Sequence, residues 1–190
     1  MSHAIDTAPG RPHIDPHTPR LLQPLARGLL WVNQALVVLG MLALLVASGV
    51  LSWSVFSRYL FQASTDWQDE AAVFCLVGAT FLCAAHVQSQ RGHVGIEALA
   101  GLLPAALNRL RLALVDLLST LFCAFFAWKS WTLFHEAWSE GQTTSSSWAP
   151  PLWIPYGLMA LGMSLLCLQL ALQLSARLNA LRAAATGRAA

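Results

Sequence analysis

Four long stretches of the chain are almost entirely apolar. No charged side chain occurs between Arg27 and Arg58, or from Ala71 to Gln90. A helix needs about 20 consecutive apolar residues to cross the hydrocarbon core of a bilayer, and each stretch provides that length. The pattern therefore predicts membrane-spanning helices over about 29–55, 68–88, 110–134 and 150–176.

The third and fourth stretches carry polar features that the first two lack. The third contains Asp116 and Lys129, which on one helix would lie about 20 Å apart and on different faces, so they cannot pair with each other. We expect Asp116 to lie near one membrane surface and Lys129 to extend towards the other, with contact to a partner helix or an ion pathway as the alternatives. In the fourth, Pro150 and Pro151 are expected in the first helical turn.

The basic residues predict an orientation. Of the 11 Lys and Arg residues, all but Arg58 and Lys129 fall in the two terminal segments or in the loop between the second and third spans. The positive-inside rule places these three segments in the cytoplasm. The prediction is an all-α membrane protein with four transmembrane helices and both termini cytoplasmic. A proline-rich, disordered tail is expected over 1–27, the transmembrane domain over 28–182, and a second tail over 183–190.

Composition narrows the function classes. Only 11% of the residues are charged, against about 25% in soluble globular domains, which argues against an ordinary soluble enzyme. A net charge of +2 is too small to indicate nucleic-acid binding. The four cysteines fall inside the predicted spans without the close C-x-x-C spacing of a zinc or redox site, so no metal or cofactor is expected.

The segment between the first two spans has the sequence features of a helix start. Thr65 and Gln68 have the spacing of a capping box. Arg58, at the end of the first helix, is expected to pair with one of the acids that follow. The acids are Asp66, Asp69 and Glu70, and their negative charges stabilise the positive N-terminal end of the second helix.

The cytoplasmic loop contains a short amphipathic segment. Apolar residues between Val94 and Leu103 suit a segment that lies in the headgroup plane between the second and third helices, and Pro104 suits the first turn of the third helix. His93 is expected to be a hydrogen-bonding surface residue, with proton transfer as the alternative.

Several of these residues form short motifs in a fixed order: Arg58-Tyr59-x-Phe61, Ser64-x-x-Trp67-x-Asp69-Glu70, Gly78-Ala79, His93-Val94-x-Ile96-Glu97 and Pro104. Their order across four spans resembles the small permease subunit of tripartite ATP-independent periplasmic (TRAP) transporters. The resemblance covers about Arg58 to Pro104, with weaker support from Pro151-x-Trp153, and the tails match nothing.

The resemblance implies a supporting role and no enzymatic activity. In this family the small subunit sits in the bacterial inner membrane and scaffolds a large multispanning permease subunit, which carries the substrate and ion sites. A periplasmic binding protein delivers the substrate, commonly an organic acid. The residues that match the family motifs, and are candidates for subunit contact, are Arg58, Tyr59, Ser64, Trp67, Asp69, Glu70, His93 and Glu97.

Two other functions remain open at this point. A haem- or quinone-binding anchor of a respiratory enzyme needs facing histidines at similar depth, but His86 and His135 are predicted at opposite membrane surfaces. An autonomous small exporter would transport without a partner.

Of the 8 tryptophans, all but Trp31 fall towards the outer side, which favours a protein contact there.

Overall fold

The computed structural model describes residues 22–62, 65–90 and 105–185. These residues form four long α-helices: α1 (Gln23–Phe61), α2 (Asp66–Ser89), α4 (Ala105–Ser139) and α5 (Trp153–Ala185). All four are long and apolar enough to cross a membrane. The predicted all-α fold with four membrane-spanning helices is confirmed. The predicted N-terminal tail up to residue 21, the interfacial segment and Pro104 lie outside the described residues.

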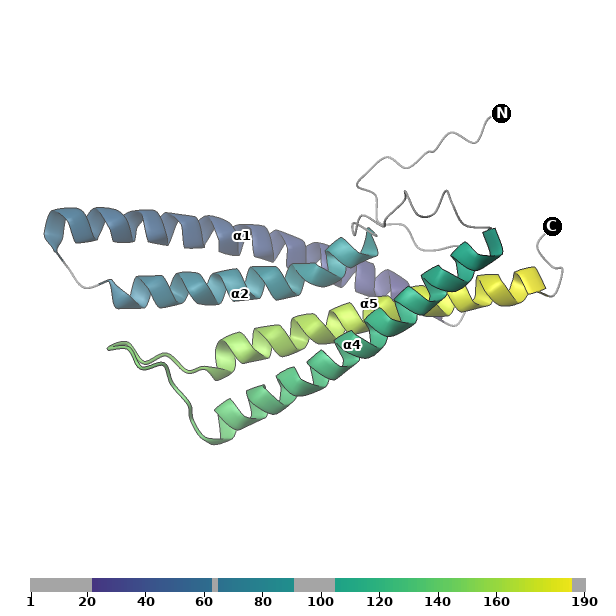
Figure 1. Cartoon of the computed structure of the whole chain (residues 1–190). Helices are drawn as coiled ribbons and strands as arrows, with labels where there is room; N and C mark the ends of the chain where they lie inside the picture. Colours follow the sequence, from purple (N-terminus) through teal and green to yellow (C-terminus); the bar gives the residue numbers. More distant parts are fainter. Residues whose placement is uncertain (1–21, 63–64, 91–104, 186–190) are drawn as a thin grey trace, which may run out of the picture.

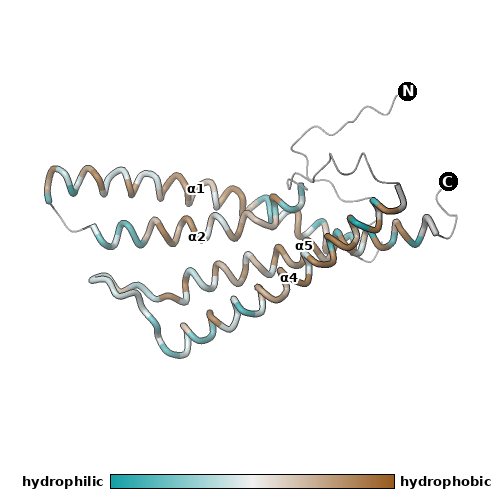
Figure 2. Tube along the Cα trace, viewed as in Figure 1, coloured by the Kyte–Doolittle hydropathy of each residue, from teal (hydrophilic) through white to brown (hydrophobic). Residues whose placement is uncertain are grey.

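The helices pack in the order α1, α2, α5, α4, so that α2 and α5 are internal and α1 and α4 form the two edges (Figure 1). We call the end where α1 finishes and α2 begins the loop end, and the opposite end the terminal end. Hydrophobic residues run along α1, whereas hydrophilic residues gather at the start of α2 (Figure 2). Large apolar side chains stay exposed on both edge helices, including Leu45, Val55, Phe122 and Phe125.

Small residues allow α1 and α2 to approach closely. Buried residues recur at every seventh position of α1, at Asn33, Gly40, Ala47 and Ser54. This spacing keeps one face of α1 against its neighbour, as in coiled-coil packing. A Cβ atom on Gly40 would overlap the Sγ atom of Cys83 on α2. A larger residue at Gly40 would therefore require the Cys83 side chain to turn away.

The contact between α2 and α5 is closer still. A Cβ atom on Gly162 of α5 would overlap the carbonyl oxygen of Phe81 and lie 2.5 Å from its carbonyl carbon. One α-helix turn earlier along α2, a Cβ on Gly78 would lie 3.1 Å from Leu158. Glycine thus brings the backbones of the two internal helices together, as small residues do in membrane helix pairs.

The starts of the first and last helices differ from the prediction. The first helix begins at Gln23, so the last residues of the predicted tail are helical, with Pro24 in the first turn. Pro150 and Pro151 precede α5, which begins at Trp153 because Pro151 is held in an antiparallel bridge with Thr143. The proline in the first turn of α5 is Pro155.

Candidate functional site

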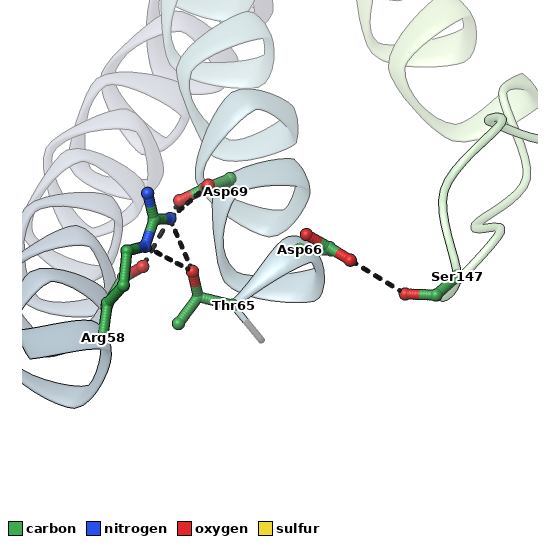
Figure 3. A network of polar contacts seen from close by, with 6 residues as sticks. Arg58, Thr65, Asp66, Asp69 and Ser147 are labelled. Atoms are coloured by element: carbon green, nitrogen blue, oxygen red, sulfur yellow. Dashed lines mark hydrogen bonds and ion pairs between the residues drawn. The ribbon is translucent and has the colours of Figure 1, made fainter. Parts of the chain in front are cut away.

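A polar network joins α1 to α2 at the loop end (Figure 3). The Arg58 Nη2 atom lies 3.1 Å from Asp69 Oδ2, and Ser54 donates a hydrogen bond of 3.4 Å to Asp69 Oδ1. The prediction that Arg58 pairs with one of the first acids of the second helix is confirmed. Both side chains are more than half exposed, at 62% and 51%, so the pair positions the helix ends and adds only about 0–1 kcal/mol of stability.

Thr65 starts α2, but not through a capping box. Its hydroxyl accepts hydrogen bonds from Arg58 Nη2 (2.5 Å) and Nε (3.2 Å), and it makes no capping hydrogen bond to α2. The predicted capping box is therefore wrong, because the guanidinium group of Arg58 takes the hydroxyl. The Thr65 carbonyl accepts the backbone N–H of Gln68 at 3.0 Å and that of Asp69 at 3.3 Å.

The connection between α4 and α5 folds back as a hairpin and reaches the start of α2 (Figures 1 and 3). Its backbone is closed by hydrogen bonds from Thr144 N–H to the Pro150 carbonyl (3.1 Å) and from Leu152 N–H to the Gln142 carbonyl (2.9 Å). Ser147 in this hairpin donates a hydrogen bond of 3.0 Å to Asp66 Oδ2. The loop end is thereby held as one surface.

Aromatic rings and a carboxylate complete that surface. The rings of Trp67 and Trp148 meet edge to face, with centroids 6.4 Å apart, and both side chains remain half exposed. Tyr59 is exposed. Glu70 is partly buried, and its Oε2 atom has no hydrogen-bond partner among the described residues. Of the other predicted contact residues, Ser64, His93 and Glu97 lie outside the described residues.

A largely buried ion pair joins α4 to α5 towards the terminal end. Arg177 Nε lies 2.6 Å from Asp116 Oδ2, and the side chains are only 16% and 15% exposed. The sequence alone does not identify the partner of Asp116, which lies far along the chain on α5. Arg177 falls directly after the predicted fourth span and was interpreted only as an orientation signal. Its place within α5 is one of the features that the sequence does not reveal.

A second buried polar contact joins α2 to α5. Gln88 Nε2 donates to Gln173 Oε1 at 2.7 Å, and Gln173 Nε2 donates to the Gln88 carbonyl at 2.9 Å. This pair was not predicted. The signal available in the sequence was the presence of Gln169 and Gln173 in an otherwise charge-free stretch. In membranes such contacts contribute about 0.6 kcal/mol each, so the pair sets helix register more than stability.

Two further polar residues lie within the helices. Lys129 is exposed on α4, with its Nζ atom 5.1 Å from the ring centroid of Trp128. Asn33 is fully buried, and neither polar atom of its side chain has a hydrogen-bond partner in the described part of the chain. Asn33 therefore makes no interhelical side-chain hydrogen bond among the described residues.

The histidines do not support a haem site. His86 lies at the terminal end of α2, where its Nε2 atom is 2.9 Å from Gln90 Nε2. His135 is exposed near the last turn of α4, at the loop end. The two rings therefore lie at opposite ends of the bundle. Within 22–62, 65–90 and 105–185, no group of three or more His, Cys, Asp or Glu side chains could hold a metal ion.

These features define a small, multi-pass, all-α membrane protein whose polar side chains mostly join helix to helix. A comparison with protein families agrees with this class. The model of the family "Tripartite ATP-independent periplasmic transporters, DctQ component" matches residues 47–180. The chain belongs to this family, which is a transporter component and not an enzyme family. A comparison with curated proteins finds no match.

Proposed function

We propose that this chain is the scaffold subunit of a TRAP transporter. It packs against a large multispanning permease subunit in a bacterial inner membrane, with both termini in the cytoplasm. It thereby supports ion-coupled uptake of an organic acid that a periplasmic binding protein delivers. The family match from the middle of α1 to near the end of α5 is the observation on which the proposal depends.

The polar side chains inside the bundle pair with one another, and this pairing supports a static role. The side chains of Asp116 and Arg177 pair with each other, and those of Gln88 and Gln173 do the same. A substrate pathway needs polar groups that are free to bind a passing solute. Paired groups that join α5 to both of its neighbours instead favour a rigid assembly.

The continuity of the helices supports the same role. Secondary transporters bind substrate near the membrane midplane, at helices that are interrupted there and that recur in repeated halves. The helices α1, α2, α4 and α5 run without interruption between their ends. The substrate site of the system is therefore expected in the large subunit.

Purification in a mild detergent tests the assembly. We expect this chain, carrying an affinity tag, to be recovered with a much larger multispanning membrane protein, identified by mass spectrometry. Reproducible recovery of the chain alone, together with solute transport by that preparation in liposomes, would contradict the proposal and would favour an autonomous exporter. A haem absorption band in the purified protein would favour the respiratory alternative.

The tryptophans at the loop end are expected to contact a second protein. Trp67 and Trp138 are 49% and 60% exposed. We expect Trp67→Ala or Trp138→Ala to lower both uptake and recovery of the complex. Trp31, which is exposed at the terminal end, provides the matched control, and Trp31→Ala should leave both unchanged. If uptake and recovery are normal in both loop-end variants, this contact does not exist.

A further inference from the structure

A groove opens on the surface of α1 and α2 at the loop end. It has a volume of about 500 Å³ and is lined by Leu51, Ser54, Val55, Arg58, Tyr59 and Asp69. This volume is in the range of about 300–1,000 Å³ that is typical of small-molecule sites. Because α1 is an edge helix, no other described helix covers its outward side. The groove is therefore accessible from the surrounding membrane.

The polar end of the groove carries one positive and one negative group side by side. Arg58 uses Nε and Nη2 for its contacts with Thr65 and Asp69, and its Nη1 atom makes no hydrogen bond among the described residues. Asp69 accepts one hydrogen bond at each oxygen, although an ionised carboxylate has about four acceptor positions. Both groups therefore keep free capacity for a ligand.

The other end of the groove is apolar. Val55 and Leu51 lie about one and two turns before Tyr59 along α1, further from the helix end. Both are exposed, as is Tyr59, which is 87% exposed. A tyrosine at the end of a spanning helix typically lies at headgroup level. The order along α1 is thus apolar towards the bilayer interior and charged towards its surface.

We propose that this groove binds a molecule of phosphatidylethanolamine. Its phosphate accepts hydrogen bonds from Arg58 Nη1 and the Tyr59 hydroxyl, its ammonium group donates to Asp69, and an acyl chain lies along Leu51 and Val55. A zwitterionic lipid presents one negative and one positive group on a short arm above apolar chains. That pattern complements the groove in both charge and polarity.

Charge complementarity also selects among the lipids. Phosphatidylglycerol has no cation for Asp69, so its phosphate and the carboxylate would share the single positive charge of Arg58. Phosphatidylcholine has a quaternary ammonium group without N–H donors, so it makes no hydrogen bond to Asp69.

A helix of a partner protein would have to supply both charges within one turn while it covered a half-exposed ion pair. The lipid satisfies both groups without that desolvation.

Native mass spectrometry of the full-length chain, released from detergent micelles that contain the three lipids in equal amounts, tests this site. We expect the wild-type chain to retain phosphatidylethanolamine about tenfold more than either other lipid, which corresponds to about 1.4 kcal/mol. Val55→Trp fills the apolar part of the groove and leaves both charged residues in place, and should remove most of the retained lipid. Leu45→Trp adds the same bulk to an exposed position of α1 outside the groove and should not.

A second variant tests the polar end. Asp69→Asn removes the negative charge, and should abolish the preference for phosphatidylethanolamine over phosphatidylcholine. Equal retention of the three lipids by the wild-type chain would overturn the proposal. Unchanged lipid retention in Val55→Trp, accompanied by loss of the large membrane protein on purification, would also overturn it and assign the groove to the partner. The lipid site does not depend on the proposed transport role, so either proposal can fail alone.

Discussion

Replacing Gly162 by alanine should force α2 and α5 apart and lower the stability of the whole bundle. The added Cβ would overlap the Phe81 carbonyl group and lie 2.8 Å from the Phe81 Cβ. A backbone carbonyl cannot rotate away as a side chain can, so the helices must move. Overpacking typically costs about 1–3 kcal/mol, and we expect the upper part of that range. The thermal unfolding midpoint in detergent measures the effect.

A matched control separates this packing effect from helix propensity. No heavy atom lies within 4 Å of the Cβ position at Gly49, on the exposed side of α1. Gly49→Ala should therefore leave the midpoint unchanged or raise it slightly. A Gly162→Ala variant with the stability of the wild-type chain would show that α2 and α5 do not approach as closely as described.

Removing one charge of the Asp116–Arg177 pair should destabilise the contact between α4 and α5. Asp116→Leu leaves the guanidinium group of Arg177 in a site where the wild-type side chain is only 16% exposed. Breaking a buried ion pair in this way costs about 3–5 kcal/mol. We expect a large fall in the unfolding midpoint and lower recovery of folded protein.

The double variant Asp116→Leu/Arg177→Leu provides the control. It removes both charges, and apolar replacement of a buried pair is often neutral or stabilising, so most of the lost stability should return. The exposed pair at the loop end offers a contrast, because Asp69→Asn should change stability by only about 0–1 kcal/mol. A double variant no more stable than Asp116→Leu would mean that the two side chains do not interact.

The helices could be predicted because charge-free length alone identifies a membrane span. Their ends were less predictable. Hydropathy marks the apolar core of a helix, whereas α1 begins at Gln23 and α5 continues to Ala185, with polar and charged turns at those ends. The start of α5 was misplaced because Pro151 is also compatible with the hairpin, where it bridges to Thr143.

Some contacts of the candidate site could be predicted from the sequence, and others could not. Arg58 and Asp69 are close in the sequence and opposite in charge, and the short connection between their helices brings them together. The partners of Asp116 and Gln88 depend on how α5 lies along its neighbours. The close approach at Gly162 fixes that register against α2, and no pattern within α5 alone specifies it.

The most direct test of the scaffold role is uptake in liposomes. The binding protein, the large membrane subunit and this chain are combined, and each is then omitted in turn, with the coupling ion gradient applied throughout. Uptake should require the large subunit and this chain together, and this chain alone should transport nothing. Transport by this chain alone, or undiminished uptake when it is omitted, would contradict its assignment as the scaffold subunit.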